Sequence, residues 1–269
     1  MQRFAVNEIT TYRWSFEEDV HNYVAAGIGG IGVWRQKLSD FGEEKAVELL
    51  GDTPLKVSSL LWAGGFTGTE GRSFKESLED AGDAVRLAAA LKASCLIIYT
   101  GPRGGHTHNH ARRLIKSAAT ELAPLAAELG VVLAVEPMHV GCAAEWTFLT
   151  DLDETIELMD SVGDTGLKLA FDTYHMGHDP AILGRLVELA PRVAVVQLGD
   201  ARQPPHGEQN RCPIGEGILP LGEIVSSLAR GGYDGFYEVE LIGEDIEAAD
   251  YGELLAQSKR AYCEMMGRA

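Results

Sequence analysis

The sequence predicts an α/β protein, a single (β/α)₈ barrel domain over residues 1–269. Short apolar runs rich in β-formers alternate with longer amphipathic stretches, eight of each, without a linker or a low-complexity segment between them. An α/β barrel uses about 250 residues as one domain, which fits this length. An open doubly wound sheet also alternates strands and helices, but its GxGxxG fingerprint is absent after the first run.

The expected strands are short apolar runs that follow glycine or turn residues. They cover residues 4–9, 28–34, 55–62, 95–99, 131–136, 167–172, 193–197 and 236–240. The expected helices between them cover residues 16–26, 41–50, 73–92, a long stretch ending at 129, 150–162, 181–189, 221–230 and the C-terminal segment. Ser15 and Ser73 are expected as N-caps before acidic first turns, and Gly130 as the residue that ends the long helix.

Composition narrows the class of protein. With 45% hydrophobic and 23% charged residues the chain is expected to bury a sizeable core. A net charge of -17 argues against a nucleic-acid partner, which needs an excess of Lys and Arg. The four cysteines form no CxxC pair, the N-terminus lacks a secretory apolar segment, and no apolar run is long enough to cross a bilayer. These features favour a cytoplasmic protein without a membrane partner.

Carboxylates end three of the apolar runs. Glu136, Asp172 and Glu240 stand at the ends of expected strands five, six and eight, and Gln197 ends strand seven. In a barrel these ends meet at one face, where active sites are built. Three carboxylates and an amide oxygen suit a hard or borderline divalent ion such as Mg²⁺ or Mn²⁺. Taken singly, a carboxylate at such a position is more often salt-bridged to a neighbouring strand end than functional.

These segments resemble the xylose-isomerase-like barrels, the sugar phosphate isomerase/epimerase superfamily. The matching pieces are VVLAVEPMH around Glu136, FDTYHMG around Asp172, VVQLGDARQ around Gln197, RCPIGEGILP from residue 211, and YDGFYEVEL around Glu240. They lie in the second half of the chain, whereas the first half matches in architecture only.

The resemblance implies one divalent metal ion held by Glu136, Asp172, Gln197 and Glu240. Mn²⁺ or Mg²⁺ is expected, with Co²⁺ and Zn²⁺ as further candidates. It also implies that Glu136 and Glu240 exchange a proton at a carbon next to a carbonyl, through an enediolate.

The resemblance further implies substrate-binding roles for His175, Arg202 and Arg211. A histidine satisfied within the barrel wall is an equal reading of His175, and solvated loop charges are the commoner reading of both arginines.

Two departures from the family pattern leave alternatives open. Most members carry His where this chain has Gln197, and Gln resembles the 3-dehydroshikimate dehydratase branch. In such a dehydratase His139, three residues after Glu136, would serve as a base or substrate ligand; it also fits an ordinary loop histidine. The endonuclease branch needs extra histidine ligands, and at those places this chain has Trp62, Thr100 and the run 209–211.

The expected function is therefore a metal-dependent isomerase or epimerase of a small sugar or sugar-like keto compound. A dehydratase of a keto-cyclitol or 3-dehydroshikimate-type compound is the first alternative, and a barrel that binds sugar or metal without turnover is the second. The sequence leaves open whether the chain forms a homo-oligomer, and whether the histidines at 106, 108 and 110 bind a second metal ion.

Overall fold

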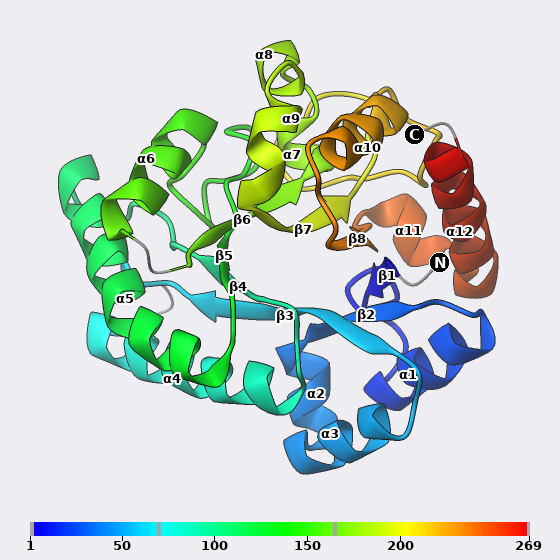
Figure 1. Cartoon of the computed structure of the whole chain (residues 1–269), viewed down its shortest axis with the longest axis horizontal. Coiled ribbons are helices and arrows are strands. Elements are labelled where there is room, and N and C mark those ends of the chain that lie inside the picture. Colours follow the sequence, from blue (N-terminus) through cyan, green and yellow to red (C-terminus); the bar gives the residue numbers. More distant parts are fainter. Residues whose placement is uncertain (1–2, 69–70, 164–165, 268–269) are drawn as a thin grey trace.

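The computed structural model, which describes residues 3–68, 71–163 and 166–267, is a closed barrel of eight parallel strands ringed by helices (Figure 1). The strands are β1 Phe4–Asn7, β2 Gly30–Trp34, β3 Lys56–Gly64, β4 Leu96–Tyr99, β5 Leu133–Val135, β6 Lys168–Asp172, β7 Val193–Leu198 and β8 Phe236–Val239. β1 pairs in parallel with both β2 and β8, and the second pairing closes the ring. This confirms the predicted (β/α)₈ barrel and excludes the open sheet.

The helices cover the outside of the barrel. They are α1 Phe16–Ala25, α2 Arg35–Phe41, α3 Glu43–Gly51, α4 Phe74–Ala90, α5 His108–Leu129, α6 Leu152–Val162, α7 Thr173–Met176, α8 Pro180–Leu183, α9 Leu186–Leu189, the 3₁₀ turn η2 Ala190–Arg192, α10 Leu221–Arg230, α11 Glu244–Ala248 and α12 Tyr251–Gly267. The predicted caps are confirmed: Ser15 and Ser73 each form a capping box, and Gly130 ends α5 at φ 70°. In the part of the chain described, no helix is long and apolar enough to cross a bilayer.

Three helices differ from the prediction. The helix expected over 41–50 is α3, and a further helix that was not expected, α2, precedes it, with Gly42 at φ 105° between the two. α6 starts at Leu152 because Asp151, not Thr150, accepts the first-turn N–H of Glu154. The helix expected over 181–189 is divided into α8 and α9 at Gly184, and Pro191 lies in the η2 turn that follows.

Alternation along the strands separates two layers of core. Val135, Phe171 and Val196 belong to the large apolar cluster that strands and helices share. Ala134, Ala170 and Val195, one position earlier on the same strands, belong to a small cluster with Leu61, Cys95 and Ile97. Because successive side chains of a strand point to opposite faces, this second cluster fills the barrel interior.

Candidate functional site

The strand-end acids extend the inward-facing positions of the barrel. Glu136 stands two residues after Ala134, Asp172 two after Ala170, and Gln197 two after Val195. All three, and Glu240, are almost completely buried, at 0 to 2% exposure. Period-two geometry therefore projects these polar groups into the carboxyl-terminal end of the barrel, directly above the apolar interior cluster.

Glu240 accepts hydrogen bonds from three sides. The Nε2 amide of Gln197 donates to its Oε2 in a short contact, and Asn7 Nδ2 donates to the same oxygen at 3.0 Å. Arg211 Nη2 lies 3.2 Å from Oε1. Because the Gln197 amide nitrogen is committed to Glu240, its Oε1 is left over as an acceptor, and this buried atom has no hydrogen-bond partner among the described residues.

Arg211 is a cation buried inside the cluster of acids. Its side chain is 0% exposed, and Nη1 lies 2.8 Å from Asp172 Oδ2 and donates to the carbonyl of Glu240 at 2.9 Å. The guanidinium also packs 4.8 Å from the centre of the Tyr174 ring. A Cβ at residue 199 would lie 2.9 Å from Nη1, so Gly199 leaves the space that this side chain occupies.

One carboxylate organises the loop that carries Arg211. Asp200 follows β7, and its side chain accepts the N–H groups of Ala201, Gly215, Gly217 and Leu219 at 2.8 to 3.3 Å. The backbone of Asp200 also accepts the N–H of Cys212 at 3.0 Å, and Arg211 N–H donates to Ile242 at 2.7 Å. These bonds attach the loop to both β7 and the segment after β8. They therefore hold the backbone of Arg211 in place.

Glu136 lies on the other side of Asp172, next to His175. His175 Nε2 is 3.8 Å from Glu136 Oε1, and the ring is 0% exposed. Asp172 brings His175 into place because its Oδ1 accepts the N–H of Tyr174 at 2.7 Å and so caps α7. The other ring nitrogen, Nδ1, lies 3.6 Å from the thiol of Cys142. Glu136, Asp172 and His175 each present a ligand atom within 4.8 Å of the others.

Burial dominates the electrostatics of this centre. It raises the pKa of Glu240 to about 8, although Arg211 acts in the opposite direction. Burial together with the neighbouring Glu240 and Asp172 raises the pKa of Glu136 well above its usual range. Burial and the Arg211 charge lower the pKa of His175 well below 6.5, so the ring is neutral at pH 7. Burial thus favours the protonated form of both glutamates in the metal-free protein, which is the form that a general acid needs.

The donor set fits a divalent cation. Glu136 Oε2, Gln197 Oε1 and His175 Nε2 are buried atoms without a hydrogen-bond partner in the described part of the chain. Such atoms cost free energy unless a ligand or an ion satisfies them. The carboxylates of Glu136, Asp172 and Glu240, when ionised, carry three negative charges against one positive charge on Arg211, so two remain uncompensated. The oxygen donors suit Mn²⁺ or Mg²⁺, and the imidazole nitrogen, if it joined them, would favour Zn²⁺.

Two of the residues predicted to bind substrate lie outside this centre. Arg202 is 56% exposed, and its guanidinium pairs with Asp245 at 2.5 Å and Glu216 at 3.4 Å. His139 lines a neighbouring cavity together with His175 and His178, and its Nδ1 accepts the N–H of Gly141 at 3.0 Å. The structure brings together the other six predicted residues: Glu136, Asp172, His175, Gln197, Arg211 and Glu240.

The histidines of residues 106–110 are engaged separately. His106 Nε2 lies 3.1 Å from the carbonyl of Thr67, and His108 Nε2 lies 2.9 Å from Glu154. His106 and His110 share a face, with ring centres 4.8 Å apart, as expected if the helix starts near Thr107. Among the described residues these histidines are not part of a group able to hold a metal ion.

Sequence reasoning missed three polar residues of the site. Asn7 ends β1 inside what was expected to be a longer strand, and Cys142 lies in the loop six residues after Glu136. Glu238 is buried two residues before Glu240 and accepts from Ser58, Ser59 and Asn7 at 2.6 to 2.7 Å. The period-two spacing of Glu238 and Glu240 was a signal that both face inward.

Comparisons with known proteins agree with this fold. The family model described as xylose isomerase-like TIM barrel matches residues 20–261. A D-psicose 3-epimerase from Enterocloster bolteae is 33% identical over 116 residues, which span 43% of this chain and only 35% of the epimerase. A candidate hydroxypyruvate isomerase from Streptomyces coelicolor is 27% identical over 200 residues, or 72% of this chain and 68% of that protein.

Among solved structures, protein SMc04130 from Sinorhizobium meliloti 1021 superposes with a TM-score of 0.90 at 25% identity, covering 98% of both chains. The family model covers nearly the whole barrel, including every strand from β2 to β8. The chain therefore belongs to the xylose isomerase-like TIM barrel family.

Proposed function

We propose that this protein is a divalent-metal-dependent isomerase or epimerase of a small keto-sugar, with Glu136 and Glu240 as its acid–base pair. The observation that carries the proposal is the buried centre in which Asp172 and Glu240 pair with one guanidinium and Glu136 lies next to His175. In the metal-free protein burial raises the pKa of both glutamates, to about 8 for Glu240, which favours the protonated form that a general acid needs.

Glu136, Asp172, Gln197 Oε1 and Glu240 would hold the metal ion. When bound, the ion would polarise the substrate carbonyl and acidify the adjacent C–H bond. One glutamate then removes the proton from that carbon, and the other returns a proton to the resulting enediolate. Return to the opposite face of the same carbon gives epimerisation, whereas return to the neighbouring carbon gives isomerisation.

Two neighbours of the acids are suited to bind substrate oxygens. His175 is neutral and buried, and its Nε2 faces Glu136 without a hydrogen-bond partner of its own in the described chain. Arg211 provides a fixed positive charge that favours the developing negative charge of an enediolate. We include both in the proposed site and leave out Arg202, whose charge is engaged at the surface.

The named relatives support this reaction class. The psicose epimerase and the hydroxypyruvate isomerase candidate are both named for small keto compounds. Their identities of 33% and 27%, and the short match to the epimerase, do not specify the substrate of this chain.

Elemental analysis of the purified protein followed by a deuterium-uptake assay tests the proposal. We expect bound Mn²⁺, Mg²⁺ or another divalent ion, and incorporation of solvent deuterium into at least one compound of a panel of psicose, tagatose, fructose, ribulose and the keto acid hydroxypyruvate. A metal-free protein that stays inert after Mn²⁺ is added, against the whole panel, would contradict the proposal.

The same assay distinguishes the dehydratase alternative. The observation that favours it is the amide of Gln197 at the position where most family members carry histidine. Adding a keto-cyclitol and 3-dehydroshikimate to the panel and recording product masses separates the two reactions, because a dehydratase product has lost one water and an isomerised product has not.

A further inference from the structure

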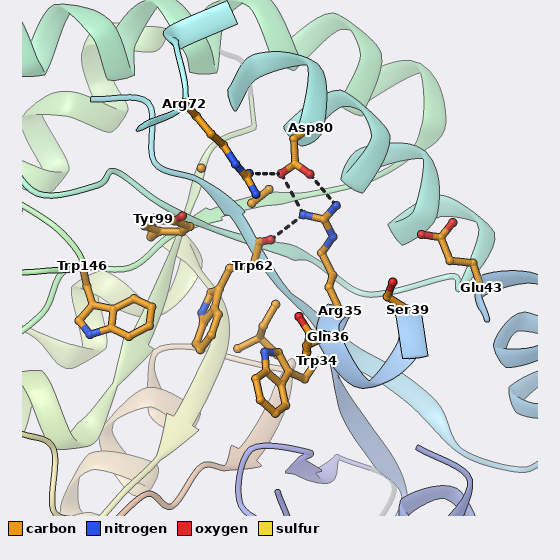
Figure 2. A pocket seen from close by; sticks show the side chains of 13 residues that line it. Trp34, Arg35, Gln36, Ser39, Glu43, Trp62, Arg72, Asp80, Tyr99 and Trp146 are labelled. Atoms are coloured by element: carbon orange, nitrogen blue, oxygen red, sulfur yellow. Dashed lines mark hydrogen bonds and ion pairs between the residues drawn. The ribbon is translucent and has the colours of Figure 1, made fainter. Parts of the chain in front are cut away.

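An aromatic cavity lies at the carboxyl ends of β2, β3 and β4, across the barrel mouth from the acids. Its volume is about 450 Å³, within the usual range of small-ligand sites. Four aromatic side chains line one side: Trp34 at the end of β2, Trp62 in β3, Tyr99 at the end of β4, and Trp146 in the loop before α6. Figure 2 shows these rings grouped together, with Trp62 between Trp146 and Trp34.

Polar groups line the opposite side of the cavity. Arg35 binds Asp80 through two hydrogen bonds of 3.0 and 3.1 Å and donates to the carbonyl of Trp62 at 2.9 Å. Arg72 lies 3.5 Å from the same Asp80 carboxylate. Figure 2 shows this group above the tryptophans, with Ser39 and Glu43 farther along the same side.

Trp62 connects the cavity to the barrel interior that lies beneath the acids. This ring packs against the apolar cluster of the barrel interior, whose members Ala134 and Ala170 stand two residues before Glu136 and Asp172. It also lies 5.5 Å, centre to centre, from Trp146. The cavity and the acids thus share the carboxyl-terminal face of the barrel, and Trp62 lies between the cavity and the interior cluster.

We propose that this cavity is a subsite for a second sugar ring attached to the reacting ketose, so that the substrate is a disaccharide or a larger ketose glycoside. The proposal rests on the proposed function of the centre, because it names the class of substrate that the same site accepts. It predicts that free ketoses bind only beside the acids at the ends of β5 to β8.

The lining favours a neutral sugar ring over other ligands. Flat aromatic faces cover the C–H face of a ring, and the arginine–aspartate group offers donors and acceptors to hydroxyls. Arg35 and Arg72 are balanced by Asp80 and Glu43, so the cavity has no formal excess of positive charge for a phosphate. A purely apolar group would leave these polar side chains without partners after they lose water.

Calorimetric titration of the metal-free protein tests the subsite. The probes are turanose, maltulose and isomaltulose, which join glucose to fructose through different oxygens, with D-fructose as reference. We expect at least one disaccharide to bind about 10-fold tighter than fructose, since an added contact of about 1.4 kcal/mol corresponds to that factor. Equal affinity for fructose and all three disaccharides, or no binding of any disaccharide, would overturn the proposal.

Variants test whether the tighter binding of disaccharides than of fructose depends on the cavity. Trp146→Ala is suitable because this side chain is 39% exposed and contributes little to the core. It should remove most of the disaccharide advantage and leave fructose affinity within 2-fold, and Arg72→Gln should reduce the advantage in the same direction. Trp14→Phe is the matched control, since Trp14 packs on Tyr251 and does not line the cavity.

Further outcomes separate a failure of the subsite from a failure of the proposed function. A loss in Trp146→Ala that is equal for fructose and disaccharide would overturn the subsite, as would tighter binding of 1-O-benzyl-fructose than of every disaccharide. Repeating the titration with Glu240→Gln separates the two proposals. Selective disaccharide binding without deuterium exchange in the wild-type protein would contradict the proposed function and leave the subsite standing.

Discussion

The two halves of the barrel mouth differ in how their polar groups are used. At β5 to β8 the acids are almost fully buried, Asp172 and Glu240 share the buried cation Arg211, and several buried acceptor atoms have no partner among the residues described. At β2 to β4 the charged groups are partly exposed and paired with one another, and aromatic rings supply most of the contact surface.

This difference separates chemistry from recognition. Unpaired buried carboxylates raise the free energy of the ligand-free protein, and binding of an ion or a substrate removes this cost. Such groups suit a catalytic centre. Paired, partly exposed charges beside flat aromatic rings cost little free energy in the ligand-free protein. Such groups suit a site that binds a ligand without reacting with it. Substitutions on the two sides should therefore affect different kinetic constants, and the following predictions test that division.

Glu240→Gln should have the largest effect. Removing an acid–base group costs about 10²–10⁴-fold in rate, and this residue is also a proposed metal ligand. Deuterium exchange under saturating Mn²⁺ is the measurement, with metal affinity determined in parallel. Glu216→Gln, an exposed acid on the same loop as Arg211, is the control and should stay near wild type. A deuterium-exchange rate in Glu240→Gln equal to that of the wild type would show that Glu240 is not part of the mechanism.

Arg211→Met should destabilise the metal-free protein by about 3 kcal/mol, because it leaves Asp172 and Glu240 without their buried counter-charge. Urea unfolding measures this loss. Mn²⁺ should restore more stability in the variant than in the wild type, since the ion then replaces the missing charge. Arg202→Met removes an exposed guanidinium and should leave stability close to that of the wild type; similar losses in both variants would contradict the special role of Arg211.

Trp146→Ala should raise KM about 10-fold for a substrate that reaches the aromatic cavity, with kcat within 2-fold. A residue that binds ground state and transition state equally changes KM alone. Steady-state kinetics on the best disaccharide from the panel measures the split. A fall in kcat without a change in KM would place this ring in the chemistry and would break the division between the halves.

His175 should make stability depend on pH in the metal-free protein. Burial lowers the folded-state pKa of His175 well below 6.5, so the unfolded chain binds more protons than the folded one as pH falls below about 6.5. Stability from this group is therefore full above that pH and is lost below it, by at most about 1.4 kcal/mol per pH unit. Urea unfolding at pH 7.0 and 5.5 should show a smaller drop for His175→Gln than for wild type. Equal drops would contradict the burial of a neutral ring.

The barrel and its inward acids follow from sequence because both are local patterns. Alternation of strands and helices predicts the fold, and a carboxylate that ends an apolar run is placed by period two alone. The positions of loop residues, in contrast, depend on tertiary contacts and not on a local pattern. Arg202 and Arg211 looked alike in sequence, but only Arg211 lies where Asp200 folds the loop back over the mouth. Cys142 and Asn7 reach the site through tertiary contacts that no spacing predicts.

The carboxylate of Asp200 has a consequence for how this loop tolerates change. It holds the chain at 201 and again at 215–219, and the backbone contact at Cys212 closes the interval between them. The stretch from 203 to 208 lies inside this closed interval and is largely exposed. Added residues there would lengthen an already closed loop, which costs little entropy. The rim of the mouth is thus a place where insertions could reshape access to substrate while the buried guanidinium keeps its position.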